Sequence, residues 1–235
     1  MDHTTLRTRV EQIRTRMREA GDRGQVTLLA AVKYADVDQI NALHRECGVH
    51  DIGENRVQQL LAHYEGLEDK QNLRIHFIGS LQKNKVKYIV DKVCMIHSLD
   101  SLSLAEEIEK RCAAIDKVMD VLVEINSGRE ASKGGLAPDE VEDFCQKLAV
   151  FPHLRLRGFM TMAPKCENLA EYRKYFGETY RQCLDIWQKK LDNISSMKKD
   201  AAKEPPVLSM GMSGSFEAAI AEGATVVRIG GALFL

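Results

Sequence analysis

Two cations stand in apolar segments of the chain that should be buried. Lys33 follows the apolar part of VTLLAAVKY (26–34), and Arg228 interrupts TVVRIGGALF (225–234). A buried cation costs several kcal/mol unless it is paired or binds a ligand. Burial and a neighbouring arginine both disfavour the ammonium form, so we expect a lowered pKa for Lys33. Such an amine condenses with aldehydes to a Schiff base, whereas an isolated lysine at a strand end commonly extends into solvent.

Two glycine-containing segments near the C-terminus are candidates for a phosphate site. SMGMSGSFEAAIAEG (209–223) places Ser213 just before a short predicted helix, and RIGG (228–231) ends a predicted strand with Gly230 and Gly231. Backbone N–H groups at such positions bind anions. Each feature alone is also typical of a serine cap or a glycine turn. Their positions after the last two strands favour phosphate binding.

A lysine and a phosphate site that face each other across the mouth of a barrel suit one kind of ligand. That ligand carries an aldehyde and a phosphate on a rigid ring, as pyridoxal 5′-phosphate (PLP) does. Arg228 would then lie beside the ring nitrogen. Because an arginine stays charged, it would keep that nitrogen unprotonated and weaken the ring as an electron sink. This disfavours transamination and similar carbanion chemistry.

The elements that position these residues alternate between strand and helix. Eight strand-like segments, separated by helical ones, predict an α/β fold, a (β/α)8 TIM barrel formed by residues 1–235 as one domain. An open doubly wound sheet is the alternative. The stretch 192–206 is polar, ends in two prolines and is interpreted as a surface connection. The predicted strands are 26–34, 49–55, 75–80, 95–101, 120–128, 154–163, 207–213 and 225–234, and helices are predicted at about 55–66, 81–91, 102–116, 138–151, 167–192 and 214–222.

Two further helices are predicted in the first fifty residues. An extra N-terminal helix carries an apolar face of Leu6, Val10, Ile13 and Met17 and is expected to pack where an eighth barrel helix is missing. The second helix follows the first strand. It is expected to begin at an Asp36–Gln39 cap and to end at Gly48.

Polar residues within the strands indicate where a site lies. Side chains alternate along a strand, and the helix-facing side should be apolar, so Lys33, Arg228, Glu124 and Asn126 are expected to point inward. His76 is interpreted as a hydrogen-bonded core histidine. The glutamine and lysines of SLQKNK (80–85) are interpreted as capping and solvating the helix that follows, with a functional role as the alternative. Lys133 lies in a loop near the predicted mouth, where it either is solvated or meets an incoming anion.

Composition excludes several classes of protein. With 33 Lys plus Arg against 34 Asp plus Glu, the chain has a net charge of −1 and no general attraction for nucleic acid or an anionic membrane surface. No apolar run approaches the roughly 18 residues of a membrane span, and the N-terminal segment lacks the basic-then-apolar order of a signal peptide. The six cysteines form no CxxC pair and are interpreted as reduced core thiols, which predicts a cytoplasmic protein without a metal site.

The chain resembles the pyridoxal phosphate homeostasis proteins, single-domain relatives of the alanine racemase N-terminal barrel. The motifs that carry the resemblance run in order across residues 28–234 and include LLAAVKYA, IGENRVQQ, IHFIGSLQKNK, EINSGREASKGG, RLRGFMTMA, LSMGMSGSFEAAIAEG and VVRIGGALF. The resemblance implies that Lys33 holds PLP as a Schiff base and that Asn55 lies near the cofactor. It also implies that Arg228 faces the pyridine nitrogen, and that Ser213 and Gly230, with Gly231, hold the phosphate.

The resemblance further implies a carrier that takes part in vitamin B6 homeostasis without established turnover. PLP-dependent apo-enzymes are the expected acceptors, and the protein is expected to be a monomer. The sequence departs from the family pattern at Tyr34, Arg56, Ser215 and Gly231, the last where the family usually has Thr or Ser. An amino-acid racemase and a Schiff-base aldolase are the alternatives. In alanine racemases a second domain and the partner subunit supply an acid/base group, and we expect no such domain in this chain.

Overall fold

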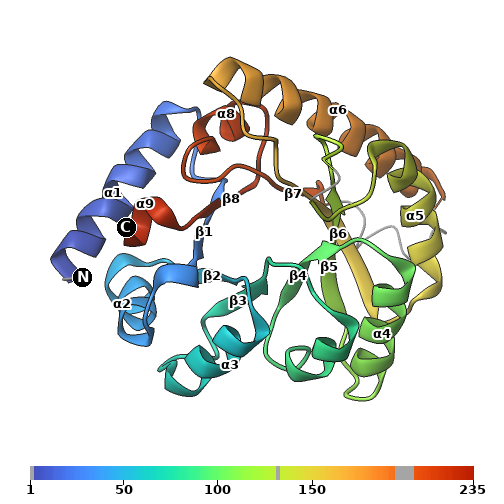
Figure 1. The fold of residues 1–235 in the computed structure, drawn as a ribbon, viewed down its shortest axis with the longest axis horizontal. Coiled ribbons are helices and arrows are strands. Elements are labelled where there is room, and N and C mark those ends of the chain that lie inside the picture. The colour runs from blue at the N-terminus through green and yellow to red at the C-terminus, as the bar shows by residue number, and fades with distance from the viewer. Residues whose placement is uncertain (1–2, 131–132, 194–203) are drawn as a thin grey trace.

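The predicted barrel is confirmed by the computed structural model, which describes residues 3–130, 133–193 and 204–235 (Figure 1). In the described part of the chain, eight parallel strands pair in chain order, and β8 pairs with β1 to close the ring. Such closure requires a register in which the last strand lies beside the first; here Ala30 pairs with Ile229. The strands are β1 Thr27–Ala31, β2 Asp51–Glu54, β3 Arg74–Phe77, β4 Met95–Leu99, β5 Met119–Ile125, β6 Leu154–Thr161, β7 Val207–Ser209 and β8 Val226–Ile229.

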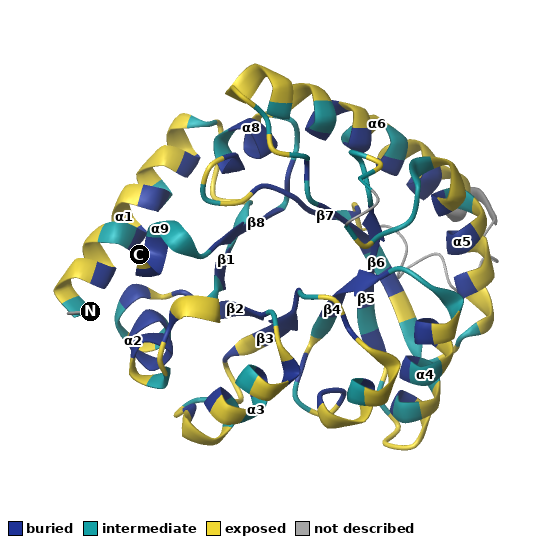
Figure 2. Ribbon diagram, viewed as in Figure 1, coloured by how far each residue is buried: buried dark blue, intermediate teal, exposed yellow. Residues whose placement is uncertain are grey.

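Helices surround this ring on its outer side (Figure 1). Apolar side chains on both faces of each strand are thereby buried, which is the reason why parallel strands read as nearly continuous apolar runs. Figure 2 shows the consequence, with buried strands and helices whose outer faces are exposed. The helices are α1 His3–Glu19, α2 Val37–Cys47, α3 Val57–Gly66, α4 Leu102–Ala113, α5 Val141–Lys147, α6 Leu169–Asn193, α8 Phe216–Ala221 and α9 Gly231–Phe234.

Helix α1 covers the gap between the ends of the helical ring. Its predicted apolar residues Leu6, Val10, Ile13 and Met17 are all buried, and the helix packs against α2, α8 and α9. Arg9 also donates a 3.1 Å hydrogen bond to the carbonyl of Leu233 in α9. The predicted substitution of the missing eighth helix by the N-terminal one is therefore confirmed.

The start of α2 also follows the sequence prediction. The Asp36 carboxylate accepts a 2.8 Å hydrogen bond from the Gln39 backbone N–H, and the Gln39 side chain accepts one from the Asp36 N–H. Gly48 ends the helix in the left-handed conformation with φ of 59°. This cap fixes the chain directly after Lys33.

Several predicted boundaries are wrong; the strands predicted at 120–128 and 207–213, for example, end at Ile125 and Ser209. The first strand ends at Ala31, and Lys33 lies in a 3-10 helix, Val32–Tyr34. The last strand ends at Ile229, because the glycine pair that follows has little strand preference and α9 begins there. Of the segment 81–91, only Lys83–Tyr88 is helical, as a 3-10 helix without a side-chain cap. Most of the predicted connection 192–206 lies outside the described residues.

The cysteine prediction is correct in part. All six cysteines belong to the described residues and carry free thiols. Four are buried as expected, but Cys94 is exposed and Cys166 is half-buried.

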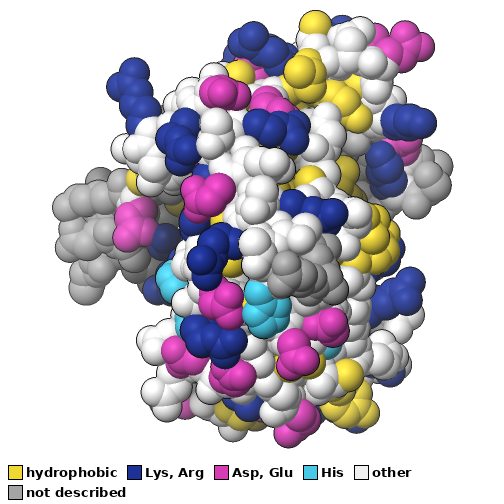
Figure 3. Space-filling view, turned by 90° about the vertical axis from the view of Figure 1, so that its left-hand side faces the viewer, with side chains coloured by type: hydrophobic (Ala, Val, Ile, Leu, Met, Phe, Trp, Pro, Cys, Tyr) yellow, Lys and Arg dark blue, Asp and Glu magenta, His cyan; other side chains and the backbone are white. Residues whose placement is uncertain are grey.

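Charges on the surface are mixed in sign. Figure 3 shows basic and acidic side chains interspersed on the face that includes α1 and α2. Several of them pair there, among them Arg16 with Glu217 and Arg45 with Glu68. Over the described ranges, no helix has the length and apolar character needed to cross a membrane.

Candidate cofactor-binding site

Arg228 lies inside the barrel, as the strand alternation predicts. Its Nη1 donates to both the carbonyl and the Oγ of Ser209, each at 2.7 Å, and its Nη2 donates to the carbonyl of Thr161 at 2.9 Å. These acceptors belong to β7 and β6, whereas Arg228 belongs to β8. Burial lowers the pKa of Arg228 to about 10, although the nearby Glu124 carboxylate opposes this effect. The guanidinium is therefore charged at neutral pH and held in one orientation.

The hydrogen bonds of Arg228 leave part of its donor capacity free. An arginine has five N–H donors, and three are used. Within the described residues, the Nε–H and one N–H of Nη2 have no acceptor. Uncommitted N–H groups on a buried cation are suited to a ligand atom that accepts a hydrogen bond.

A carboxyl group of unusual acidity lies near Arg228. Glu124 is buried in β5, and its burial, with the charge of Asp100, raises its pKa to about 7; Arg228 opposes that rise. An ideal Cβ on Gly134 would lie 3.8 Å from each Glu124 oxygen and 3.6 Å from an Asp100 oxygen. The loop after β5 therefore covers both carboxyl groups. Asn126 ties this loop down, since its amide donates to the carbonyls of Glu130 and Lys133.

The two glycine-containing segments meet, as their predicted role requires. The Ser213 Oγ accepts a 3.2 Å hydrogen bond from the backbone N–H of Ala232, which joins the loop after β7 to the start of α9. An ideal Cβ on Gly231 would lie 4.0 Å from that Oγ. The alternative in which Ser213 caps the helix that follows it is wrong, because Ser215 stands at the N-cap of α8. The Ser215 hydroxyl instead accepts a hydrogen bond from the Met212 N–H and closes the loop.

Lys33 is next to this pair of loops. An ideal Cβ on Gly230 would lie 3.0 Å from the carbonyl of Ala31, two residues before the lysine. The lysine segment and the glycine pair are therefore side by side, not opposite each other as predicted. Lys33 is exposed, so the expectation of a buried amine is wrong. The reason is local: the 3-10 turn ends the strand alternation before residue 33.

The Lys33 segment is held in two ways. Gln59 of α3 donates a 2.9 Å hydrogen bond to the Lys33 carbonyl, and the lysine Nζ lies 5.0 Å from the centroid of the Tyr34 ring. The backbone is thus fixed while the amine stays accessible. This combination suits a nucleophile that must meet an incoming ligand.

Asn55 follows β2 at the same end of the barrel. An ideal Cβ on Gly79 would lie 2.1 Å from the Asn55 carbonyl, so only glycine allows the loop after β3 to pack this closely. One residue earlier, the Glu54 carboxylate is hydrogen-bonded to the Nδ1 of His63 in α3 at 2.7 Å. These contacts fix the backbone around Asn55.

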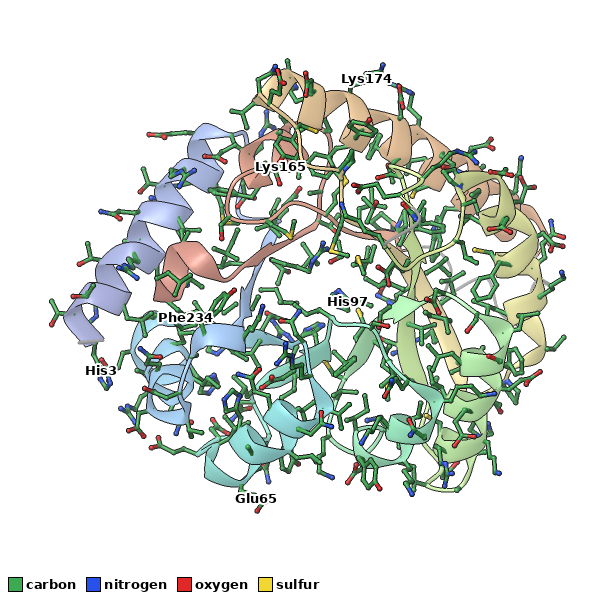
Figure 4. The ribbon with its side chains drawn as sticks, in the orientation of Figure 1. His3, Glu65, His97, Lys165, Lys174 and Phe234 are labelled. Carbon is green, nitrogen blue, oxygen red and sulfur yellow. The ribbon has the colours of Figure 1, made fainter. Side chains whose placement is uncertain are left out.

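Sequence reasoning missed the partners of Arg228. Ser209 and Thr161 anchor the guanidinium, and His97 lies 3.0 Å from the Ser209 Oγ inside the ring of strands (Figure 4). In the sequence, these residues could have been recognised as polar residues within otherwise apolar strands. His76 was interpreted correctly as a buried, hydrogen-bonded histidine.

The arrangement fits a phosphorylated pyridine aldehyde. Free N–H groups of Arg228 match the ring nitrogen, and the accessible amine of Lys33 matches the aldehyde. A Cβ on Gly214 would meet no atom within 4 Å, so the loop beside Ser213 is open at this position. Among the described residues, no group of His, Cys, Asp and Glu is arranged to hold a metal ion.

The sequence matches the family model of the alanine racemase N-terminal domain over residues 1–235. It is 42% identical over 227 residues to the pyridoxal phosphate homeostasis protein of Aquifex aeolicus, covering 96% of this chain and 93% of that protein. The protein of the same name from Helicobacter pylori strain 26695 is 38% identical, with 97% and 95% of the two chains covered.

Solved structures are similar over the whole barrel. PipY of Synechococcus elongatus with PLP bound has a TM-score of 0.83 at 26% identity, covering 98% of this chain and all of PipY. An alanine racemase of Clostridium difficile 630 has a TM-score of 0.68 at 17% identity, a likeness of fold, and only 56% of the racemase is covered. The chain therefore belongs to the alanine racemase N-terminal domain family and, within it, to the pyridoxal phosphate homeostasis proteins.

Proposed function

We propose that this protein binds PLP and carries it reversibly as a Schiff base on Lys33. The Lys33 amine condenses with the cofactor aldehyde, forming a C=N bond and releasing one water. Arg228 donates a hydrogen bond to the pyridine nitrogen, while Ser213 and the backbone of Gly230 and Gly231 hold the phosphate. Asn55 lies beside the ring.

The observation that supports this proposal best is the state of Arg228. A permanently charged guanidinium with unused N–H donors is buried between strands whose ends carry Lys33, Ser213 and the glycine pair. A pyridine nitrogen that accepts a hydrogen bond from arginine stays unprotonated, and the ring then withdraws electrons weakly. This suits storage of the cofactor better than turnover.

Release follows from the same chemistry. An amine of a substrate or of an apo-enzyme can replace Lys33 on the aldehyde carbon, because the lysine is exposed. PLP-dependent apo-enzymes are therefore the proposed acceptors. The protein is proposed to act as a monomer in the cytoplasm, where its six free thiols stay reduced.

An absorption spectrum before and after addition of PLP tests the proposal. Wild type is expected to gain a visible band, Lys33→Ala to lose it, and Lys87→Ala, at an exposed lysine of the 3-10 helix Lys83–Tyr88, to keep it. Borohydride reduction followed by peptide mapping should attach the cofactor to Lys33. An intact band in Lys33→Ala would refute the assignment of this lysine.

The same material separates the carrier from its alternatives. A racemase would convert L- to D-amino acids well above the rate of free PLP. A Schiff-base aldolase would be trapped with a sugar phosphate by borohydride in the absence of PLP. The carrier is expected to do neither.

A further inference from the structure

A chain of hydrogen bonds crosses the interior of the barrel. Arg228 donates to the Ser209 Oγ, which lies 3.0 Å from the Nδ1 of His97. The Nε2 of His97 lies 3.0 Å from the Nδ1 of His76, and the Nε2 of His76 lies 3.0 Å from the Asp51 carboxylate. All five side chains are buried, and His97 and Ser209 have no exposed surface. The chain therefore joins Arg228 to a carboxylate on the far side of the interior.

One link of the chain joins strands that are not neighbours in the sheet, whereas the other links join adjacent strands. His97 belongs to β4 and Ser209 to β7, so their contact spans the interior rather than one edge of the sheet. Asp51 is the first residue of β2, whereas Ser209 is the last residue of β7. Because parallel strands run in one direction, the chain extends from the amino end of the barrel toward the carboxyl end, where the proposed site lies. Asp51 is paired at its outer end with Arg74.

The donors and acceptors allow two proton counts. With both histidines neutral, every bond can point one way: Arg228 to Ser209, Ser209 to His97, His97 to His76, and His76 to Asp51. With one more proton on His76, His76 donates to His97, and the His97 Nδ1–H donates to Ser209. The Ser209 Oγ then accepts from both His97 and Arg228. One proton therefore reverses the orientation of the Ser209 hydroxyl.

The charges around the histidine pair assign the extra proton to His76. Burial lowers its pKa, but the hydrogen bonds of its ring to Asp51 and Cys94, together with the charges of these two groups, outweigh burial and raise that pKa to about 9. Burial, together with the charges of His76 and Arg228, keeps the pKa of His97 well below its usual range. Arg74 and Cys94 are the other titratable groups that face this pair.

We propose that His97 and His76 are positioning residues for Arg228, and that the proton they share sets how the guanidinium meets the bound cofactor. The inference rests on the proposed function, in which Arg228 contacts the pyridine nitrogen. When Ser209 accepts from both sides, two donors compete for one oxygen, and a second positive charge lies in the interior. When the histidines are neutral, all bonds run in one direction and strengthen one another. The cofactor is thus linked to a titrating group that it does not touch.

Linkage gives a test on the wild-type protein alone. If the proton on the histidine pair changes PLP binding, PLP must change the pKa of the pair by the reciprocal amount. ¹⁵N NMR of the imidazole rings is recorded from about pH 6 to about pH 10, with and without PLP. We expect the pH midpoint of the His76 titration to differ by about 0.5 pH unit or more between the free and the PLP-bound protein. This corresponds to a change of roughly threefold in PLP affinity. The ring signals of His153, which pairs with Glu109 outside the barrel interior, are expected to be the same with and without PLP.

A substitution gives the converse test. His97→Gln keeps a hydrogen-bonding side chain but cannot transmit the proton. His153→Gln is the control, because it removes a histidine that pairs with Glu109 away from the hydrogen-bond chain. The ratio of variant to wild-type PLP affinity is measured against pH, which cancels any pH dependence that the two proteins share. For His97→Gln this ratio should change by about threefold or more across the His76 titration, and for His153→Gln it should stay flat.

The outcomes separate the two proposals. A wild type that binds PLP with a visible band, but whose His76 midpoint is the same with and without PLP, overturns this inference and leaves the carrier intact. A wild type that gives no band and no binding overturns both. The NMR result stands even where His97→Gln fails to fold.

Discussion

The Ser213 hydroxyl and the Ala232 backbone N–H are joined by a hydrogen bond of 3.2 Å. This contact connects the loop after β7 to the first turn after β8. The two segments that the sequence predicts to bind phosphate therefore form one structural unit. Removing the hydroxyl should therefore affect both loops at once.

Ser213→Ala is expected to weaken PLP binding by about tenfold, because a hydrogen bond to a charged group contributes about 1.5–3 kcal/mol and part of it is replaced by water. The measurement is a titration followed by the visible band. Ser103→Ala, at an exposed serine of α4, is the control and should bind like wild type. Equal affinity in the two variants would remove Ser213 from the phosphate site.

Gly231→Ser should strengthen binding by several-fold through an added hydroxyl near the phosphate. The position has room, since an ideal Cβ would meet only Leu235 at 3.8 Å and the Ser213 Oγ at 4.0 Å. Gly231→Ala adds the same Cβ without the hydroxyl and also gains the helix preference of a non-glycine residue. Only an affinity above that of Gly231→Ala supports the predicted contact, and calorimetric titration measures it.

Glu124 should make stability depend on pH. Burial and Asp100 raise its pKa from the ordinary 4.5 to about 7, so the folded chain holds this proton more tightly than the unfolded chain. Stability is then lost as the pH rises from about 4.5 to about 7, and the loss amounts to about 3 kcal/mol.

Glu124→Gln removes that titration. Urea unfolding should therefore show a stability difference between variant and wild type that grows in favour of the variant over this window and levels off above it. A difference that stays constant with pH would show that Glu124 titrates normally.

Gln59→Ala should loosen the segment that carries Lys33. The glutamine Nε2 donates to the Lys33 carbonyl at 2.9 Å, and such a bond contributes about 1 kcal/mol. Amide hydrogen exchange across residues 32–35 should speed up, and PLP affinity should fall by up to about fivefold. Gln71→Ala, at an exposed glutamine before β3, should change neither.

The barrel could be predicted from the sequence because its signals are repeated. Buried apolar strands alternate with amphipathic helices, and each unit supports the same architecture. The cap of α2 was predictable for a related reason, since Asp36, Gln39 and Gly48 act through contacts that are local in the chain.

The interior contacts could not be predicted in the same way. His97 and Ser209 are separated by 112 residues and meet only because the barrel closes. The exposure of Lys33 was missed because an apolar run continues through Val32, and a run alone does not show where a strand turns into a 3-10 helix. The position of Lys33 beside the glycine pair follows from the pairing of β8 with β1, which the closed barrel itself implies.

The 3-10 turn that carries Lys33 divides the proposed site into a fixed part and an accessible part. Arg228 is clamped among strands in the interior, whereas the lysine amine stands at the rim on a short exposed turn. If the protein carries PLP as proposed, transfer to another amine needs only the C=N bond between Lys33 and the cofactor to be exchanged. The barrel stays closed during this exchange, so transfer of the cofactor requires no unfolding. Its rate is set by the access of the acceptor amine to the cofactor.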